Sequence, residues 1–506
     1  MLSIHDTGPP PPCPAPFNLA AHVLAAGAED RIALQIVGHT GAERWSYARL
    51  RAAVRGTGGA LLGLGLRPGD RVLMRLGNTV DFPIVYLGAI AAGLVPVPTS
   101  TQLTVSEVER IAAEIGPALI AAGPDVALPG AASCPVLGLP QLRAMRDHAP
   151  CDWDMGDPDR QAYLIYTSGT SGRPRAVAHA HRAVWARRMM HDGWYGLRSD
   201  DRMLHAGAFN WTYTLWTGLL DPWTLGATAL IPAAGVTPAQ LPLLLKRFDA
   251  TIFAAAPGVY RQMLRAPFPP LPRLRHGLSA GEKLADALRA DWLAATGRPV
   301  FEALGMSECS TFISGCPDRP APPGTSGWPQ PGRRVAVLGP GGAPVPRGQA
   351  GVLAVSAQDP GLFLGYLDQP EETAARFAGD WFLTGDVVTM DAAGAIAYLG
   401  RDDDMMNAGG FRVSPLEVER AMNAHPARAE TACAEIEVAP GTTVIGCFYT
   451  AATAQDAEEL AAFAAQHLAR YKQPRLFVHL PDLPRGPNGK LQRRALQALW
   501  QAGGGA

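Results

Sequence analysis

The chain has 506 residues, a length at which a polypeptide normally divides into two or three packed units, because single cores rarely grow beyond roughly 250 to 300 residues. Its 44 basic and 45 acidic side chains leave a net charge of −1, which excludes a strong electrostatic attraction to nucleic acid or to an anionic membrane. We therefore expect a multidomain globular protein whose main partner is a small molecule.

The cysteines and the apolar segments indicate in which cellular compartment the protein lies. Seven cysteines occur without a C-x-x-C pair, which indicates neither a disulfide framework nor a zinc knuckle. The N-terminus lacks the basic start and apolar run of a signal peptide, and the longest apolar stretch, residues 84–98, is too short to span a bilayer. These features predict a cytoplasmic protein with no membrane span.

Strand-like and helix-like segments alternate along most of the chain. Residues 1–16 include a proline-rich run that we expect to be disordered or to lie on the surface. A strand over residues 71–76, a helix over 82–92 and a strand over 94–98 follow in βαβ order, which predicts a parallel sheet with helices on its faces. The same alternation predicts further strands over residues 161–166, 227–231, 251–256 and 300–303.

The predicted fold is α/β, with two domains joined by a hinge. Residues 17–400 should form a large N-terminal domain of parallel and mixed sheets with helices, and its short strands and Gly-Pro turns over about 324–398 predict a small β-rich subdomain. The acidic and Gly-rich residues 401–410 predict the hinge. Residues 411–506 should form a small, mobile α+β domain, in which Ser414 and Glu417 predict a capping box.

A loop after an apolar strand has the composition of a phosphate site. Residues 166–175 read YTSGTSGRPR, and the six residues 167–172 within them contain four hydroxyl side chains and two glycines. Small residues let consecutive N–H groups point inward, and the hydroxyls add donors, an arrangement that suits a polyphosphate. The loop is not a Walker A motif, because G-x-x-x-x-G-K-[ST] does not match it. An ordinary Ser/Gly surface turn is the alternative.

This loop closely resembles the phosphate signature of the adenylate-forming superfamily, which includes acyl-CoA synthetases, adenylation domains of peptide synthetases and luciferases. Residues 305–308, 384–386, 400–419 and 487–490 resemble further motifs of that family in the same order. The similarity extends from about residue 17 to the C-terminus. It implies an acid–thiol ligase that uses ATP, Mg²⁺ and coenzyme A, and that forms an acyl-AMP and then an acyl-CoA thioester.

The resemblance also implies an ATP site built from several segments. Where the family usually has Pro-Lys-Gly, this chain has Pro174-Arg175-Ala176, in keeping with its use of 40 arginines and four lysines. Leu304 replaces the usual Tyr or Phe, so we expect weaker stacking on adenine and an uncertain preference for ATP over GTP. The implied ATP-binding residues are Thr167, Ser168, Gly169, Thr170, Ser171, Gly172 and Arg175 at the phosphates, Ala280, Gly281, Glu282, Lys283, Leu304, Gly305 and Met306 near adenine, and Asp386 and Arg401 at the ribose.

Three residues are the candidates for catalysis. A carboxylate attacking the α-phosphate brings two anions together, so cations are needed where negative charge collects. Glu308 is a hard oxygen ligand suited to Mg²⁺, and Ser307 matches the family residue that contacts the α-phosphate. Lys490 follows an Asn-Gly turn, and its compact ammonium could lie between the substrate carboxylate and the α-phosphate.

The second half-reaction implies a domain rotation, because one pocket geometry cannot serve both pyrophosphate exit and thiol entry. In the family the pivot lies two residues after the hinge arginine, which is Asp403 here. Gly409 and Gly410 would then line a tunnel for the thiol arm, although they could instead be plain turn formers. Arg412 matches a family arginine of the adenylation pose.

Acid specificity is expected from residues 205–213. His205, Phe209, Asn210, Trp211 and Tyr213 suit an apolar tail or ring, although Tyr213 in particular could belong to a core face. Amino-acid-activating relatives carry Phe-Asp where this chain has Phe209-Asn210, so no carboxylate is present for an amine. We expect an aromatic or medium-chain acid.

Other functions remain open at this point. The thiol could belong to a separate carrier protein, and a homodimer is compatible with the sequence. A non-enzymatic alternative is an AMP-binding regulatory protein without catalytic activity. The presence of Glu308 and Lys490 disfavours this hypothesis. A luciferase-like oxygenase is conceivable from the fold alone.

Overall fold

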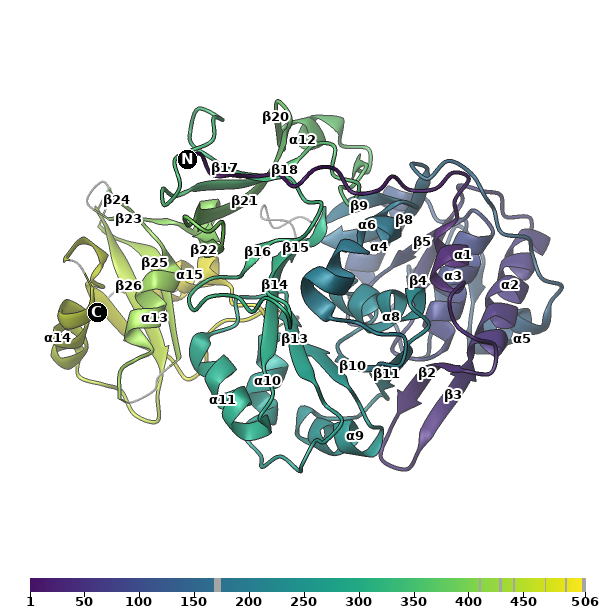
Figure 1. Cartoon of the computed structure of the whole chain (residues 1–506), viewed down its shortest axis with the longest axis horizontal. Helices are drawn as coiled ribbons and strands as arrows, with labels where there is room; N and C mark the ends of the chain where they lie inside the picture. Colours follow the sequence, from purple (N-terminus) through teal and green to yellow (C-terminus); the bar gives the residue numbers. More distant parts are fainter. Residues whose placement is uncertain are drawn as a thin grey trace. The chain divides into compact units, whose positions relative to one another are not determined.

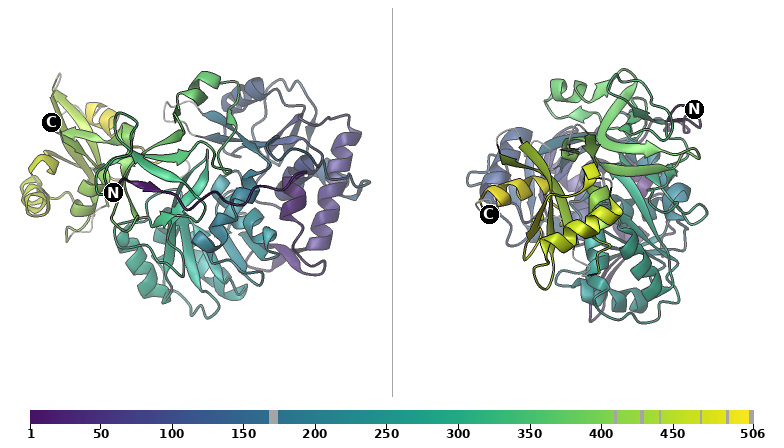
Figure 2. Two further views of the ribbon diagram at one scale, coloured as in Figure 1. Left: turned by 45° about the horizontal axis from the view of Figure 1, so that its top comes forward. Right: turned by 90° about the vertical axis from the view of Figure 1, so that its left-hand side faces the viewer.

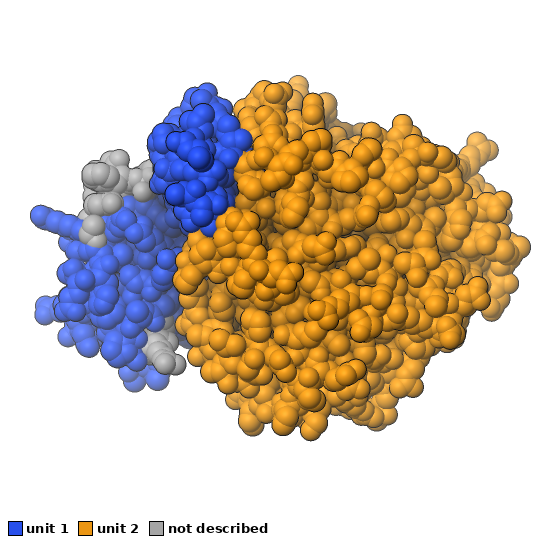
Figure 3. All heavy atoms as spheres, in the orientation of Figure 1, with its two compact units in different colours: residues 1–4, 335–355, 383–506 blue, residues 5–334, 356–382 orange. Residues whose placement is uncertain are grey.

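The computed structural model describes residues 1–167, 174–408, 411–426, 430–439, 442–468, 470–486 and 489–502. The chain divides into two compact units, coloured separately in Figure 3. Unit 2 comprises residues 5–334 and 356–382, and unit 1 comprises residues 1–4, 335–355 and 383–506. Both units mix helices and strands, so the α/β prediction with a large N-terminal and a small C-terminal part is confirmed.

A nine-stranded sheet forms the centre of unit 2 (Figure 1). Its six inner strands run parallel, whereas the edge strands β3, β15 and β16 are antiparallel to their neighbours. The inner strands are apolar on both faces, as expected where helices cover both sides of a parallel sheet. In spatial order the strands are β16 (Trp328–Pro329), β15 (Ser310–Ser314), β14 (Val300–Met306), β13 (His276–Ala280), β12 (Ile252–Ala255), β10 (Arg202–Ala206), β11 (Thr228–Pro232), β2 (Ile32–Val37) and β3 (Ala42–Ser46).

A second sheet confirms the predicted βαβ unit. Strand β4 (Arg71–Arg75) pairs in parallel with β5 (Val95–Pro98), and α3 (Asp81–Ala91) connects them. Every residue of α3 is buried, which explains why its sequence is apolar on all sides. The sheet continues through β6 (Leu119–Ala122) to β7 (Val136–Leu137).

The strand predicted at residues 161–166 belongs to a different sheet from the one expected. β8 (Gln161–Thr167) pairs antiparallel with β9 (Arg175–Ala180), which in turn pairs antiparallel with β19 (Gly365–Tyr366). The connection from β8 to β9 is too short for a parallel crossover, so the two strands form a hairpin. The candidate phosphate loop is the connection between them.

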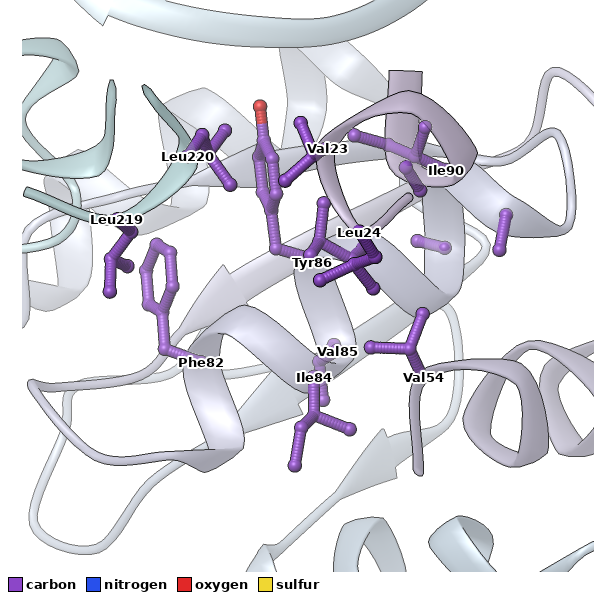
Figure 4. Packing of buried hydrophobic residues seen from close by; sticks show 14 of the residues in the cluster. Val23, Leu24, Val54, Phe82, Ile84, Val85, Tyr86, Ile90, Leu219 and Leu220 are labelled. Atoms are coloured by element: carbon purple, nitrogen blue, oxygen red, sulfur yellow. The ribbon is translucent and has the colours of Figure 1, made fainter. Parts of the chain in front are cut away.

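The remaining helices of unit 2 pack around these sheets, and the largest core lies where α1, α2 and α3 meet the sheets (Figure 4). Phe82 and Tyr86 of α3 contact Leu219 and Leu220 in this core, together with Val23 and Leu24. The helices are α1 (Leu19–Val23), α2 (Tyr47–Gly63), α4 (Val105–Ile115), α5 (Leu139–Ala144), α6 (Ala183–Ala186), α7 (Thr212–Leu215), α8 (Asp221–Thr224), α9 (Leu241–Arg247), α10 (Pro257–Met263), α11 (Asp286–Thr296) and α12 (Pro370–Ala374), with π-helical turns at His191–Tyr195 and Trp216–Leu220.

Unit 1 begins with a twisted antiparallel sheet. Strand β17 (Val335–Leu338) pairs with β18 (Gly351–Ser356), and β21 (Trp381–Met390) pairs with β22 (Ile396–Arg401). Residues at the N-terminus join this sheet, because the Ser3 N–H donates to the Val345 carbonyl (2.8 Å) and the Ser3 carbonyl accepts from the Val337 N–H (2.9 Å). The short strands β1 (Ile4–His5) and β20 (Phe377–Ala378) were not expected from the sequence.

A three-stranded sheet with helices on both faces forms the rest of unit 1 (Figure 2). Alternate residues of β25 separate its two cores: Cys433 packs with α13 and α14, whereas Ala432 and Ala434 pack with α15. The elements are β23 (Met406–Ala408), β24 (Phe411–Val413), α13 (Pro415–Met422), β25 (Glu430–Ala439), β26 (Thr442–Thr450), α14 (Ala457–His467), β27 (Leu476–His479) and α15 (Arg493–Ala502).

Two sequence predictions differ in detail from this arrangement. Residues 335–355 and 383–400 group with the C-terminal part rather than with the large body, and their strands belong to one sheet. Ser414 caps α13 as predicted, with its Oγ accepting from the Glu417 N–H (3.3 Å), but the Glu417 carboxylate pairs with Lys472. Among the described residues, no helix is both long and apolar enough to cross a membrane.

Two buried tyrosines should respond oppositely to loss of the hydroxyl. In the described part of the chain the Tyr86 hydroxyl has no hydrogen-bond partner, whereas the Tyr47 hydroxyl donates to the Ala227 carbonyl (2.6 Å). Tyr86→Phe should therefore raise the free energy of unfolding by about 1 kcal/mol, and Tyr47→Phe should lower it by about the same amount. Urea denaturation of both variants measures the difference. A loss of stability in Tyr86→Phe would contradict the unpaired hydroxyl.

Candidate active site

Ser307 and Glu308, two of the three candidates for catalysis, lie in the tight turn between β14 and β15. Residues 307–309 connect the antiparallel strands, and the register shifts between Leu304 and Gly305. At Gly305 a Cβ would lie only 2.2 Å from the Ser310 carbonyl oxygen and 2.4 Å from the Thr311 Cα. Because those are backbone atoms, only glycine permits this approach. The turn therefore depends on the glycine of the sequence motif.

Three contacts hold the first part of the turn. The His179 Nε2 donates to the Ser307 carbonyl (2.8 Å), the Phe363 N–H donates to the Glu308 carbonyl (2.7 Å), and the Tyr366 hydroxyl donates to Glu308 Oε1 (2.7 Å). Burial lowers the pKa of His179 to about 4, so its imidazole is neutral at physiological pH. Glu308 is 9% exposed, and its side chain is oriented by the Tyr366 hydroxyl.

The two ends of the predicted phosphate loop lie on adjacent strands of the three-stranded sheet that also contains Tyr366. Thr167 is the last residue of β8, and Arg175 is the first residue of β9, directly opposite it. The Arg175 guanidinium pairs with Glu372 (2.7 Å) and lies over the Tyr366 ring, 5.1 Å from its centre. Tyr366 thus contacts both Arg175 and Glu308. Ser168, Gly169, Thr170, Ser171 and Gly172 lie outside the described residues.

The predicted adenine segment follows β13. Gly281 has a φ of +94°, and no heavy atom lies within 4 Å of a Cβ built on it, so its backbone is accessible to a planar ligand. Ala280 ends the strand, and Leu304, Gly305 and Met306 are half-buried at the end of the neighbouring strand β14. This spacing is compatible with the predicted adenine contact.

The side chain of Lys283, in the predicted adenine segment, contacts a buried carboxylate. Its ammonium donates to Glu302 Oε2 (2.7 Å), and Arg289 donates to the same oxygen (3.2 Å). The Leu284 N–H donates to the other Glu302 oxygen (3.0 Å). Lys283 therefore neutralises a buried carboxylate, a structural role that the sequence did not suggest. Glu282 precedes it, and both remain predictions as ATP-binding residues.

The two predicted ribose residues pair in unit 1. Asp386 on β21 lies opposite Arg401 on β22, and the Arg401 Nη1 donates to Asp386 Oδ1 (3.1 Å) and to the Thr384 carbonyl (3.0 Å). The Asp386 N–H donates to the Thr384 hydroxyl (3.1 Å), and Asp386 is buried. The Arg401 hydrogen bond orients the Asp386 carboxylate, and both residues lie on one antiparallel ladder.

Lys490 lies in a closed loop of unit 1. The Gly486 N–H donates to the Lys490 carbonyl (2.8 Å), and the Gln492 N–H donates to the Pro484 carbonyl (2.9 Å). Gly489 has a φ of +79°, which glycine adopts without strain. The Arg485 Nη1 donates to the Gly489 carbonyl (2.9 Å), and Arg485 also pairs with Glu430. The loop backbone at Lys490 is thereby fixed, and the side chain is exposed.

The predicted hinge contains short regular elements. Asp402–Asp404 form a 3₁₀ turn that includes Asp403, and Arg412 lies on β24 opposite Asn407. Gly409 and Gly410 lie outside the described residues. The pivot and tunnel assignments therefore stay predictions.

The predicted acid-pocket residues are divided between core and surface. Phe209 is buried against Phe82, with ring centres 5.2 Å apart, and Tyr213 donates to the Leu278 carbonyl (3.0 Å) while stacking on Trp194. These contacts correspond to the core alternative for Tyr213. Asn210 and Trp211 are half-buried at the start of α7. The prediction of an acid pocket rests most directly on these two.

His205 is buried on the central sheet. Its ring lies edge-on to Tyr213, with centres 4.4 Å apart, and Gly218 leaves room for it because a Cβ there would lie 2.8 Å from the His205 Cβ. Both ring nitrogens lack a hydrogen-bond partner in the described part of the chain. Burial lowers the pKa of His205 to about 3. The imidazole is therefore neutral and behaves as a packing group.

Several residues that matter here were missed by sequence reasoning. His179 lies within β9, the strand that follows the phosphate loop. Its position next to that motif is the one sequence feature that could have indicated its role. Tyr366 contacts Glu308 from a distant segment, and Arg187, the C-cap residue of α6, contacts Ser310, without any sequence pattern that links them. A small cavity lies beside the turn, lined among others by Tyr163, His179, Arg187, Thr212, Trp216, Ser307 and Ser310.

Comparison with known proteins gives one consistent family. The profile of the AMP-binding enzyme family matches residues 22–367, and that of the AMP-binding enzyme C-terminal domain matches residues 417–490. The chain is 32% identical to the benzoate–CoA ligase of Thauera aromatica, covering 98% of this chain and 99% of that protein. It is 30% identical to the 3-hydroxybenzoate–CoA ligase of Aromatoleum sp. (strain CIB), covering 95% of each. The crystal structure of ATP-bound MatB from Rhodopseudomonas palustris superposes with a TM-score of 0.88 at 26% identity, covering 96% of this chain and 99% of that one.

The buried histidine His205 predicts a specific pH dependence of stability. Its folded pKa of about 3 lies below its ordinary value of 6.5, so the unfolded chain takes up a proton first as the pH falls below about 6.5. The wild-type protein should lose up to about 1.4 kcal/mol per pH unit through this group. His205→Leu should remove that contribution. Urea unfolding at several pH values between about 4 and 7 measures it, and an unchanged slope in the variant would contradict the neutral buried imidazole.

Proposed function

This chain belongs to the AMP-binding enzyme family, and we infer that it is an ATP-dependent carboxylate–CoA ligase that forms an acyl-adenylate and then an acyl-CoA thioester. The observation that carries the detailed proposal is the Gly305–Ser310 turn, in which Glu308 is oriented by Tyr366 and Ser307 by His179. Alignment with two aryl–CoA ligases over nearly the whole of each chain supports it.

We propose that Glu308 and Ser307 serve the adenylation half-reaction. Mg²⁺ in proteins usually binds one or two carboxylates together with substrate phosphates and water, and a single oriented carboxylate at position 308 fits that donor set. When bound, the ion would neutralise charge on the phosphate oxygens. Among the described residues there is no cluster of three His, Cys, Asp or Glu side chains that could hold a metal alone. Ser307 would donate its hydroxyl to the α-phosphate.

Arg175 supports phosphate binding in this proposal. Its side chain is held by Glu372 and by the Tyr366 ring at the start of β9. The guanidinium always carries its charge and suits phosphate oxygens, although its planar fork differs in shape from the lysine usual in the family. The loop from Thr167 to Gly172 would supply backbone N–H groups. Gly281 would let adenine approach the backbone, and Asp386 would accept hydrogen bonds from the ribose hydroxyls.

Lys490 would complete the adenylation site. An ammonium beside the reacting carboxylate and the α-phosphate reduces their repulsion and stabilises the charge of the transition state. The hydrogen bonds that close its loop, and the positive φ of Gly489, fix the backbone from which the side chain extends. We propose that a rotation about residues 401–410, with Asp403 as pivot, removes Lys490 after adenylation. Gly409 and Gly410 would then face the incoming thiol, whereas Arg412 would belong to the face used in the adenylation pose.

An aromatic acid is the substrate class that we propose, with a medium-chain acid as the alternative. The relatives named above act on benzoate and 3-hydroxybenzoate. Asn210 and Trp211 are half-buried next to α7, and position 210 offers an amide rather than a carboxylate for an amino group. Phe209, Tyr213 and His205 would support the pocket wall, because they pack in the core and flank Asn210 and Trp211 in the sequence.

Coenzyme A is the proposed thiol, and a separate carrier protein is the alternative acceptor. The names of the relatives favour coenzyme A. A reducing cytoplasm is the compartment that we propose, because all seven cysteines are free. A homodimer stays a prediction of the sequence.

The proposed function is tested with purified full-length protein, ATP, Mg²⁺ and a panel of benzoate, 3-hydroxybenzoate, 4-hydroxybenzoate and straight-chain acids. Pyrophosphate release should require an acid and increase with coenzyme A. Lys490→Ala should lower acid-dependent ATP–pyrophosphate exchange by about a hundredfold or more, because it removes charge stabilisation of the transition state. Conversion of supplied benzoyl-adenylate and coenzyme A to the thioester should change by less than about threefold.

Lys246→Ala is the matched control, since Lys246 is exposed on α9 and is one of the four lysines. It should behave as wild type in both half-reactions. Equal losses of both half-reactions in Lys490→Ala would contradict a role confined to adenylation. Pyrophosphate release that coenzyme A does not increase would favour the carrier protein, and no release with any acid would favour a regulatory AMP-binding protein.

The proposed metal role of Glu308 is tested by Glu308→Gln. The amide preserves shape and can still contact Tyr366, but it is a weaker ligand for Mg²⁺ than a carboxylate. The Mg²⁺ concentration for half-maximal exchange should rise by about tenfold or more. Glu109→Gln, an exposed change on α4, is the control. An unchanged Mg²⁺ requirement together with reduced exchange would assign Glu308 a role other than metal binding.

A further inference from the structure

A buried ion pair lies directly behind the catalytic turn. Arg187 of unit 2 is paired with Asp221 through two nitrogens, with Nε 2.9 Å from Oδ1 and Nη2 2.7 Å from Oδ2. The side chain of Arg187 is 4% exposed and that of Asp221 is 0% exposed. The Tyr195 hydroxyl donates to Asp221 Oδ2 (2.6 Å) and accepts from Arg187 Nη2 (3.0 Å). The pair is therefore fully hydrogen-bonded in a fixed orientation.

The remaining nitrogen of Arg187 points at the turn. Its Nη1 donates to the hydroxyl of Ser310, the residue at which the chain enters β15 after Ser307 and Glu308. Ser310 has a φ of +64°, in the left-handed region that a serine rarely adopts. Such a conformation costs of order 1–3 kcal/mol and persists only where the surroundings impose it.

A small cavity lies beside the turn, next to the Arg187 hydrogen bond. Arg187, Trp216, Ser307 and Ser310 all line it. The contacts of His179, Phe363 and Tyr366 reach Ser307 and Glu308, whereas the contact from Arg187 reaches the other end of the turn. The Arg187 hydrogen bond thus constrains the part of the turn that those three contacts do not reach.

We propose that Arg187, oriented by Asp221, is a positioning residue for catalysis: it holds Ser310 in its left-handed conformation and thereby sets the positions of Ser307 and Glu308. The inference rests on the proposed function of that turn. Arginine suits the task because its planar group can donate to Asp221, Tyr195 and Ser310 at once, which the point charge of a lysine cannot do in the same geometry. Burial would lower the pKa of Arg187, but Asp221 outweighs it and raises the pKa above its ordinary value, so the donor stays charged.

Two substitutions at position 310 test whether the hydrogen bond from Arg187 holds the left-handed conformation. Ser310→Ala removes the hydroxyl but keeps a Cβ at positive φ, whereas Ser310→Gly removes the hydroxyl and allows the same φ without strain. Acid-dependent ATP–pyrophosphate exchange should fall by about tenfold or more in Ser310→Ala, mainly in kcat, and should recover by about threefold or more in Ser310→Gly relative to Ser310→Ala. The acid is the best substrate from the panel described above.

Arg187 itself is tested without leaving a buried charge unpaired. The double variant Arg187→Met with Asp221→Leu replaces the pair by apolar side chains of similar size, which limits the cost to folding. It should reduce exchange about as much as Ser310→Ala, and adding Ser310→Gly to it should restore exchange by about threefold or more. A purely structural role of the pair would not be rescued by a glycine at position 310.

A control variant distinguishes a general effect of backbone strain from an effect of strain within the turn. Asp249 also has a positive φ of 48° and is exposed after α9, so Asp249→Ala introduces a comparable backbone cost away from the turn. It should leave exchange unchanged and lower the thermal unfolding temperature less than Ser310→Ala, which also leaves the buried Arg187 Nη1 donor without its acceptor. Exchange at the wild-type level in Ser310→Ala, or equal losses in Ser310→Ala and Ser310→Gly, would overturn the proposal. Absence of acid-dependent exchange in the wild type would instead refute the proposed function on which it rests.

Discussion

The close approach of β14 and β15 at Gly305 is the constraint on which the candidate site depends. A side chain there would collide with the Ser310 carbonyl at 2.2 Å, so the hairpin can close only with glycine at that position. The closed hairpin places Ser307 and Glu308 in a turn whose backbone and carboxylate are held by His179, Phe363 and Tyr366. The sheet therefore supplies a rigid support for groups that must be placed accurately.

Two ion pairs with a buried carboxylate lie next to loops of the central sheet. Arg187 with Asp221, and Lys283 with Glu302, lie behind segments that precede or follow strands of the central sheet. Each carboxylate accepts several hydrogen bonds, which is the condition under which a buried ion pair is tolerated. In the second pair Lys283, one of four lysines in this chain, donates to Glu302.

The two units carry different parts of the proposed chemistry. Unit 2 contains the phosphate strands, the Glu308 turn and the half-buried residues Asn210 and Trp211. Unit 1 contains the Asp386–Arg401 pair and the closed loop of Lys490. In a ligase with two half-reactions, a group needed for adenylation alone, as proposed for Lys490, can be brought in and withdrawn by rotation about a hinge such as the one proposed at residues 401–410.

The sequence by itself determined the fold class, the βαβ order around α3, the Ser414 helix cap and the family, because local periodicity, capping residues and ordered motifs are encoded in neighbouring residues. It also led to Asp386 and Arg401, which the structure pairs. The antiparallel pairing of β8, the core packing of Phe209 and Tyr213, and the commitment of Lys283 to Glu302 were decided by tertiary structure. Tyr366 and Arg187 could not be predicted because they reach the Glu308 turn from segments distant in sequence, and only the folded chain brings them together.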